Sequence, residues 1–276
     1  MSRHSLRQSP RSIITGAGSG FGRALAVELA RRSGSLVLSD VNLPGLEETA
    51  ALARAAGASS VTTLRCDVAE LADVEAVAAA AGNAPIDLVV NNAGISCGGL
   101  VGEVSISDWK KTIDIDLWGV IYGCHVFTPI LRRQGHGAFL NVASAAGLLA
   151  APRMAPYNVA KAGVVSLSET LSSELLETGI TVTVLCPTFF RTNIATSGLF
   201  ADARTKRMAE KLVAKGRPVE EVVNAALTSV EQGELYCLPM ADARWFWRAK
   251  RALPGSFRTL LSRFDKLMTK KKQPSR

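Results

Sequence analysis

The chain has 276 residues, of which 47% are hydrophobic and 20% are charged, and its net charge is +8. This length and composition are typical of one large globular domain with a sizeable core, and they exclude wholesale disorder. No apolar run reaches the roughly 18 residues that a membrane-spanning helix needs.

Short β-rich runs alternate with longer helical patterns along the whole chain. The predicted strands are residues 12–15, 35–39, 61–66, 88–91, 138–143, 181–185 and 234–238. The predicted helices are residues 21–32, 46–56, 71–80, 107–132, 155–177 and 219–231. This alternation predicts a single doubly wound α/β domain, with a seven-stranded parallel sheet covered by helices on both faces. We place the domain at 12–243, after a flexible N-terminal tail at 1–11 and before a C-terminal extension at 244–276.

A glycine-rich turn joins the first predicted strand to the first predicted helix. Gly16, Gly20 and Gly22 are separated by three residues and then by one, so the common G-x-G-x-x-G spacing does not fit. Glycines at such a turn let the backbone approach a pyrophosphate, whose negative charge the helix N-terminus favours. We predict that this turn binds a dinucleotide, with Ser19 and Phe21 among the contacts; a plain glycine-rich turn is the alternative.

An acidic residue, Asp40, lies at the end of the second predicted strand, 20 residues after Gly20. A carboxylate there can accept hydrogen bonds from both ribose hydroxyls of NAD, and it would repel the extra phosphate of NADP. Position 19 is a serine rather than a base, and no Lys or Arg directly follows Asp40. The sequence therefore predicts NAD in preference to NADP, although a surface Asp that starts a turn would look the same.

Tyr157 and Lys161 are four residues apart, and so lie on one face of a predicted helix. A free tyrosine titrates near about pH 10, and a neighbouring cation stabilises the phenolate and lowers the pKa. Tyr157 could then exchange a proton with an alcohol or ketone while hydride moves to or from a nicotinamide. Ser144, just after a predicted strand, could hold the substrate oxygen.

These motifs together resemble the classical short-chain dehydrogenase/reductase family over residues 12–239. The matching pieces, in chain order, are the 15–22 turn, Asp67-Val68, Asn91-Asn92-Ala93-Gly94, Ser144, Tyr157 with Lys161, and Cys186-Pro187 with Thr192. The resemblance implies a Rossmann-type oxidoreductase that interconverts an alcohol and a ketone with a nicotinamide dinucleotide. It also implies a homodimer or a homotetramer.

The resemblance further implies roles for individual residues. Asp67 and Val68 would contact the adenine, and Asn91, Ala93 and Gly94 would support the central strand and the cofactor. Lys161 would also bind the nicotinamide ribose, and Thr192 would contact the carboxamide. Pro187 and Phe190 are expected beside the nicotinamide.

Two positions depart from the family pattern. Asp116 stands where the family usually has an Asn that helps to hold a water beside the Lys. We hypothesise that this proton relay survives with an altered pH dependence, the alternative being that the backbone geometry does the work. Thr188 stands where a glycine usually follows the proline, and it begins a bulky Thr188-Phe189-Phe190 run.

The predicted substrate side is mostly small or apolar. Its candidate residues are Cys97, Leu149, Met154 and Phe189, beside Ser144. Such a lining suits a hydrophobic secondary alcohol or ketone, and residues 193–217 are expected to form a mobile lid. Packing against that lid is the alternative role of these residues.

The cysteines and histidines indicate neither a disulfide framework nor a metal site. The five cysteines are Cys66, Cys97, Cys124, Cys186 and Cys237. Their number and wide spacing indicate reduced thiols in a cytoplasmic protein. The three histidines lie away from any cluster of metal-ligating residues.

The positive charge is concentrated in the C-terminal extension. Residues 244–276 contain 11 Lys or Arg and one acid, which gives +10, so the preceding residues carry −2 of the total of +8. The body thus lacks the basic footprint that nucleic-acid binding needs, and we expect no such partner. Apolar residues recur at helical spacing from Phe257 to Met268, among several bases. This pattern predicts peripheral contact with a membrane, or packing on the body or on a neighbouring subunit.

Two other functions remain open at this point. The chain could be a non-catalytic dinucleotide sensor or scaffold, or a membrane-tethered interaction protein. The combination of Ser144, Tyr157 and Lys161 favours an enzyme.

Overall fold

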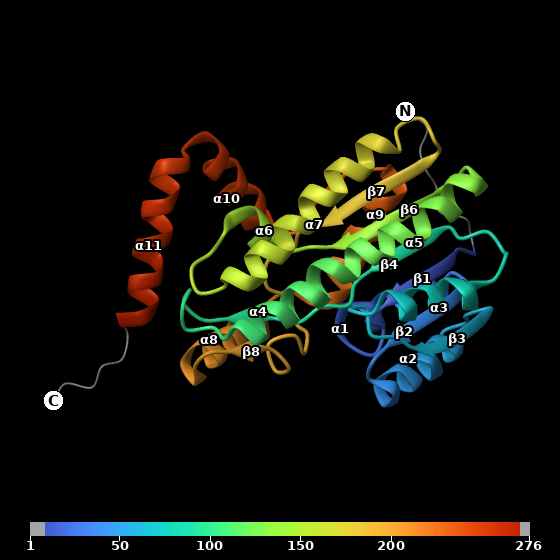
Figure 1. Cartoon of the computed structure of the whole chain (residues 1–276), viewed down its shortest axis with the longest axis horizontal. Helices are drawn as coiled ribbons and strands as arrows, with labels where there is room; N and C mark the ends of the chain where they lie inside the picture. The colour runs from blue at the N-terminus through green and yellow to red at the C-terminus, as the bar shows by residue number, and fades with distance from the viewer. Residues whose placement is uncertain (1–8, 271–276) are drawn as a thin grey trace.

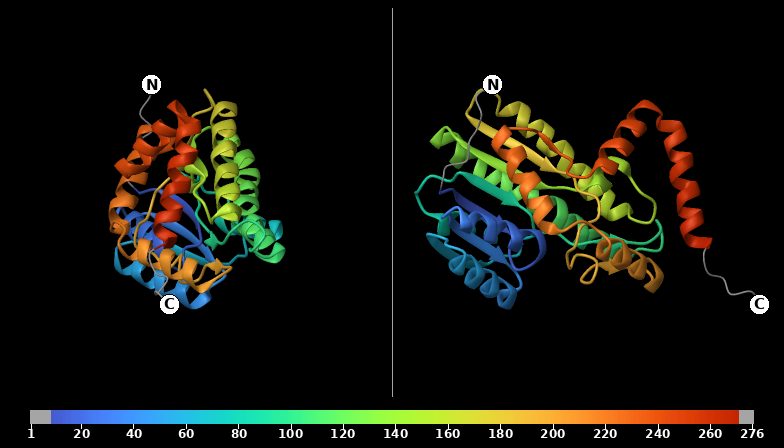
Figure 2. Two further views of the ribbon diagram at one scale, coloured as in Figure 1. Left: turned by 90° about the vertical axis from the view of Figure 1, so that its left-hand side faces the viewer. Right: turned by 180° about the vertical axis from the view of Figure 1, so that it is seen from behind.

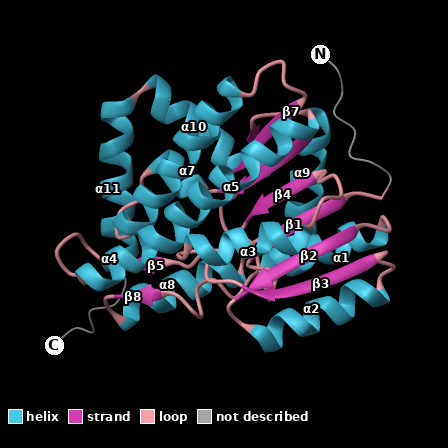
Figure 3. Ribbon diagram, turned by 45° about the vertical axis from the view of Figure 1, so that its right-hand side comes forward, coloured by secondary structure: helices cyan, strands magenta, loops and turns pink. Residues whose placement is uncertain are grey.

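The computed structural model of the chain describes residues 9–270. One seven-stranded parallel sheet runs through the molecule, in the order β3-β2-β1-β4-β6-β7-β9 (Figures 1 and 3). The strands are β1 (Arg11–Thr15), β2 (Ser35–Asp40), β3 (Ser60–Arg65), β4 (Leu88–Asn91), β6 (Gly137–Val142), β7 (Ile180–Leu185) and β9 (Tyr236–Cys237). The predicted seven-stranded doubly wound sheet is therefore confirmed. Most of the predicted N-terminal tail lies outside the described residues, and Arg11 already belongs to β1.

Helices cover both faces of the sheet. The helices are α1 (Gly20–Arg31), α2 (Leu43–Ala55), α3 (Leu71–Ala81), α5 (Gly119–Gln134), α7 (Ala155–Glu174) and α9 (Val219–Gln232). The apolar sides of α1, α2 and α9 form one buried cluster with the sheet, and those of α3, α5 and α7 form the other. The strand order reverses between β1 and β4, and ligands bind such sheets beyond the carboxyl ends of the strands at this reversal.

The long helix predicted at 107–132 is interrupted by a π-helical turn. The segment consists of α4 (Ile106–Ile113), the π-helix η1 (Asp114–Trp118) and then α5. Asp116 lies in the middle of η1 and is fully buried. π turns are rare and often mark functional sites.

The loops beyond the carboxyl ends of the strands contain further short elements. β5 (Cys97–Gly98) pairs in parallel with β8 (Leu199–Phe200), and α8 (Ala203–Ala214) follows. The segment expected to form a lid therefore folds onto residues 96–98, where the Ser96 hydroxyl donates to Ile194 O at 2.7 Å. A short helix, α6 (Ala145–Leu149), begins just after Ser144.

Two helices form the C-terminal extension, α10 (Ala241–Ala252) and α11 (Pro254–Lys270). α10 packs beside α6, and α11 stands out from the body at the end of the molecule toward which the strands point (Figures 1 and 3). None of the described helices is both long and apolar enough to cross a bilayer.

Candidate active site

The glycine turn between β1 and α1 is packed tightly against the loop after β4. Gly16 has a φ of +65°, and a Cβ added there would lie 2.6 Å from Ala93 Cα. A Cβ on Gly22 would lie 2.4 Å from Gly16 O. The Asn92 side chain donates to both Thr15 O (2.8 Å) and Gly16 O (2.9 Å). Asn92, which the sequence showed only as part of a motif, thus fixes the shape of the turn.

The N-terminus of α1 is open to an anionic ligand. Ser19 is the N-cap residue, yet its side chain makes no capping hydrogen bond, and the first turn contains no acid. Such a helix end presents unpaired N–H groups and a partial positive charge, which together favour a phosphate. Gly20, with a φ of +53°, lies beside Thr192, whose side chain would be 3.5 Å from an added Cβ. This brings together two residues predicted to bind the cofactor.

Asp40 lies directly beside this turn. Its carboxylate accepts hydrogen bonds from Gly18 N and from Asn42 N, both at 2.8 Å. Arg23, which sequence reasoning missed, donates to Gly18 O at 2.7 Å and forms an ion pair with Glu48. In the sequence, the only indication that Arg23 belongs to this site is its position four residues after Ser19, in the first helix.

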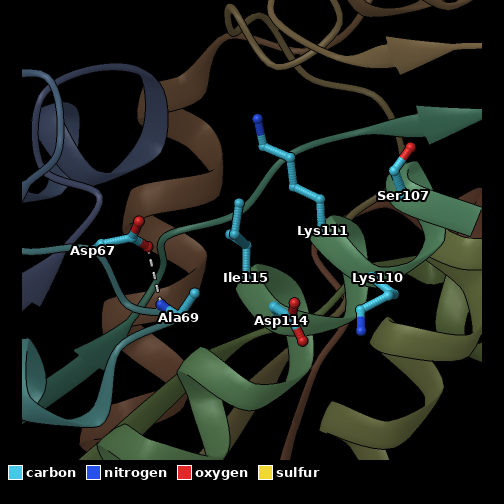
Figure 4. Close-up of a pocket in the computed structure, with 7 residues that line it drawn as sticks. All are labelled: Asp67, Ala69, Ser107, Lys110, Lys111, Asp114 and Ile115. Carbon is cyan, nitrogen blue, oxygen red and sulfur yellow. Dashed lines mark hydrogen bonds between the residues drawn. The ribbon is translucent and has the colours of Figure 1, made fainter.

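Asp67 and Val68 follow β3 at the same edge of the sheet. Asp67 accepts from Ala69 N at 3.1 Å, and Val68 is buried against Gly119 at the start of α5. Asp67 also lines a pocket of about 350 Å³ with residues of α4 and η1 (Figure 4). The pocket residues are Asp67, Ala69, Ser107, Lys110, Lys111, Asp114 and Ile115.

Four polar side chains meet beyond the carboxyl ends of β4 and β6. Tyr157 and Lys161, on α7, are both buried, and Lys161 Nζ lies 5.6 Å from the centroid of the Tyr157 ring. Lys161 Nζ donates to Val142 O at 3.0 Å and lies 3.4 Å from Asp116 Oδ2. Ser144 hydrogen-bonds to the Tyr157 phenol. The structure thus brings together all four residues that the sequence singled out for catalysis.

Asp116 forms a buried ion pair with Lys161 in this cluster. Its Oδ1 accepts from Ile95 N at 2.7 Å, and Oδ2 faces the Lys161 ammonium. The pKa of the Asp116 carboxyl is raised above its ordinary value, because the effect of burial is larger than the opposing effects of Lys161 and the Ile95 N–H. Gly94 allows this close approach, since an added Cβ would lie 3.2 Å from Asp116 Oδ1 and 3.3 Å from Lys161 Nζ.

The pKa of Tyr157 is raised in the structure. Burial is the main cause, the Asp116 carboxylate adds to it, and the hydrogen bond with Ser144 acts in the opposite direction. From Lys161 alone the sequence predicted a lowered pKa. The difference arises mainly because the phenol is buried, which disfavours the phenolate, and the Asp116 carboxylate beside Lys161 adds to this effect.

A chain of buried polar side chains lies behind the cluster. Asn91 Nδ2 donates to Asn141 Oδ1 at 2.8 Å, and Asn141 Nδ2 donates to Ser168 Oγ at 3.0 Å. Ser168 lies on α7, two turns after Lys161. Asn91, expected to support the cofactor, therefore contacts the helix of the catalytic pair through Asn141.

The loop after β7 contains the residues expected near the nicotinamide. The Ser144 hydroxyl lies 3.4 Å from Pro187 O, and the Phe190 ring packs edge-on against Phe21 with centroids 6.3 Å apart. Thr192 adjoins Gly20, as described above. These residues connect the catalytic cluster to the glycine turn.

The predicted substrate residues differ in how far they are exposed to solvent. Phe189 is 41% exposed, and Leu149 and Met154 are half-buried. Cys97 is only 1% exposed, because it pairs with Leu199 in the β5–β8 sheet. Cys97 is thus a packing residue of the β5–β8 pair in this arrangement. No group of His, Cys, Asp and Glu among residues 9–270 is arranged to hold a metal ion.

The chain is similar to known proteins over most of its length. A family model described as short chain dehydrogenase matches residues 11–200. The chain is 40% identical over 202 residues to a Mycobacterium tuberculosis protein named "Putative oxidoreductase SadH", a match that covers 71% of this chain and 72% of that protein.

Two solved structures share the fold. A short-chain dehydrogenase/reductase from Burkholderia phymatum in complex with NAD has a TM-score of 0.83 and 33% identity, covering 91% of this chain and 95% of that one. A short-chain dehydrogenase from Sphingobium yanoikuyae in complex with NADPH has a TM-score of 0.75 and 29% identity, covering 97% and 98%. The chain belongs to the short-chain dehydrogenase/reductase family, whose members are NAD(P)-dependent oxidoreductases acting on hydroxyl or carbonyl groups.

Proposed function

We propose that the chain interconverts a hydrophobic secondary alcohol and its ketone with NAD as the cofactor. The observation that carries this proposal is the convergence of Ser144, Tyr157 and Lys161 at the carboxyl end of the sheet, within one buried cluster. A hydroxyl, a phenol and an ammonium in this arrangement can orient a substrate oxygen and exchange a proton with it.

The residues around the glycine turn fit a nicotinamide dinucleotide. The uncapped N-terminus of α1 suits the pyrophosphate, and the closely packed glycines leave the backbone free to approach it. Asp40 would accept hydrogen bonds from the adenosine ribose, and Asp67 and Val68 would contact the adenine. Ala93, Pro187, Phe190 and Thr192 would surround the nicotinamide end. When bound, the nicotinamide accepts or supplies the hydride.

Each of the four catalytic side chains has a separate role in the proposed reaction. Ser144 holds the substrate oxygen, and Tyr157 takes the hydroxyl proton during oxidation or returns it during reduction. Because its pKa is raised, Tyr157 holds its proton at neutral pH, which suits ketone reduction. Lys161 supplies a positive charge 5.6 Å from the centre of the Tyr157 ring, and Asp116 balances that charge.

The preference for NAD rests on Asp40. Its carboxylate is fixed by two backbone N–H groups at the turn and would repel a ribose phosphate. Arg23 is the nearest base found at this turn, and its guanidinium is already engaged by Glu48 and by Gly18 O.

A cofactor titration followed by a panel of secondary alcohols and ketones tests the proposal. Nicotinamide absorbance should change with one or more apolar substrates, and Tyr157→Phe should reduce turnover about 10²–10⁴-fold without abolishing NAD binding. NAD binding without turnover on any substrate would favour a dinucleotide sensor instead. Turnover in Tyr157→Phe as fast as in the unmodified protein would refute the assigned chemistry.

A further inference from the structure

The C-terminal helices expose an unusual combination of apolar and basic side chains. Trp245 on α10 is 76% exposed, Leu253 directly after α10 is 63% exposed, and Leu260 on α11 is 52% exposed. Trp247 points elsewhere, since its ring packs on Tyr236 with centroids 5.0 Å apart. The exposed aromatic and aliphatic side chains therefore take no large part in the packing of the extension on the body.

The bases of these helices are exposed beside the apolar residues. Arg248 follows Trp245 by three residues on α10, and Arg263 follows Leu260 by three residues on α11, so each base lies on the same side of its helix as the apolar residue; both bases are exposed. Residues 244–276 as a whole carry a net charge of +10, in a protein whose remaining residues carry −2. The positive charge is thus concentrated in this segment of the chain and is not a property of the entire molecule.

We propose that α10 and α11 form a docking surface for an anionic lipid membrane. Basic helices with aromatic and leucine side chains bind at the boundary between headgroups and acyl chains, where tryptophan is favoured. Charge complementarity selects this occupant. A second copy of the chain would bring two segments of +10 together, which repel. A nucleic acid would match the bases but would leave Leu253 and Leu260 without apolar contacts. The docking does not depend on the proposed reaction.

The docking surface is attached to the rim of the candidate active site. Lys250 Nζ donates to Leu148 O at 2.6 Å, and Arg153 forms an ion pair with Asp265 at 2.8 Å. Residues 148–153 connect Ser144 to the helix of Tyr157. Viewed toward the carboxyl ends of the strands, α11 runs in front of the body (Figure 2, left). A membrane bound to this surface would therefore lie on the side of the molecule that holds the segment between Ser144 and α7.

Vesicle sedimentation of the full chain tests the docking. The protein should sediment with phosphatidylcholine vesicles that contain phosphatidylglycerol, and much less with phosphatidylcholine alone. Each base near an anionic membrane strengthens binding about fivefold, so the double variant Arg248→Gln/Arg263→Gln should weaken binding about 25-fold. Trp245→Glu/Leu253→Glu should also remove most of it.

Leu176→Glu is the matched control for the apolar variant. Leu176 is 71% exposed and precedes β7, at the edge of the sheet opposite the carboxyl ends of the strands, so its change should leave sedimentation intact. Turnover of a water-soluble alcohol should be unchanged in all three variants. An enzyme without turnover that still sediments would leave the docking valid and would reject only the proposed reaction.

Three results would overturn the docking. The first is full-chain protein that does not sediment, or that sediments equally with neutral vesicles. The second is a smaller size-exclusion mass for Trp245→Glu/Leu253→Glu, since this face would then be covered by another copy. The third is retention by RNA or DNA that Arg248→Gln/Arg263→Gln abolishes, in the absence of vesicle binding.

Discussion

Replacing Asp116 with asparagine should move the alkaline limb of alcohol oxidation to lower pH. In the structure Asp116 neutralises Lys161 from 3.4 Å and adds to the raised pKa of Tyr157. The variant removes the negative charge and leaves the ammonium uncompensated, so the phenolate is stabilised and its pKa falls. Oxidation needs the phenolate, and its rate at a fixed pH below that pKa should therefore rise.

The size of this effect follows from the position of Lys161. A unit charge at the 5.6 Å that separates Nζ from the Tyr157 ring centroid interacts by about 3 kcal/mol at an effective dielectric constant of about 20. This corresponds to about two pKa units, and since the charge acts on the phenolic oxygen rather than on the ring centroid, we expect a shift of about one to two units. Oxidation below the pKa should then be about ten- to a hundredfold faster than in the unmodified enzyme.

The assay is the pH dependence of kcat for oxidation and reduction of one substrate pair. The amide oxygen introduced by Asp116→Asn can still accept from Ile95 N, so the variant should fold and bind NAD, which circular dichroism and cofactor titration would check. Asp114→Asn is the control, because it removes the same charge two residues earlier in η1. An unchanged or upward-shifted limb in Asp116→Asn would refute both the charge argument and the altered pH dependence inferred from the sequence.

Three further changes test other parts of the site. Asp40→Asn should lower the ratio of kcat/KM for NAD to that for NADP by about tenfold or more, because the repelling charge is lost; an unchanged ratio would contradict the assigned preference. Gly22→Ala should weaken NAD binding and lower Tm, because its Cβ would lie 2.4 Å from Gly16 O; calorimetry and titration would show it, and a variant with unaltered affinity would count against the tight turn. Arg153→Met should raise KM for the alcohol about two- to fivefold with little change in KM for NAD, because the partly buried ion pair that it removes contributes about 0.5–1 kcal/mol. The control Arg65→Met removes the exposed ion pair with Asp73 and should leave both KM values unchanged.

The sequence was sufficient for the elements with strong periodicity. Each of the seven main strands begins and ends within two residues of its predicted limits, because buried parallel strands are continuous apolar runs between turn residues. The π turn at 114–118 gave no signal, since its residues fit an ordinary helix and its extra residue appears only in three dimensions. The β5–β8 pair is only two residues long on each side, and its pairing depends on contacts far apart in the chain.

The catalytic residues could be predicted, but their electrostatics could not. A pattern of Tyr-x-x-x-Lys shows that a cation lies near a phenol, which predicts a lowered pKa. The opposite outcome depends on how deeply Tyr157 is buried and on the contact between Asp116 and Lys161, which come from separate helices. Cys97 was predicted to line the substrate side because its neighbours in sequence are the small residues typical of a binding loop. Its burial in the β5–β8 pair could not be read from the sequence.

The buried bonds from Asn91 through Asn141 to Ser168 have a consequence for how α7 is oriented about its own axis. A helix held only by aliphatic contacts could roll by several degrees at little cost, whereas directional bonds in a dry interior resist rotation. Ser168 and Lys161 are seven residues apart, close to two full turns, so fixing the azimuth of one fixes that of the other. The orientation of the Lys161 ammonium is therefore fixed by hydrogen bonds inside the protein core, and substitutions well away from any ligand can change it.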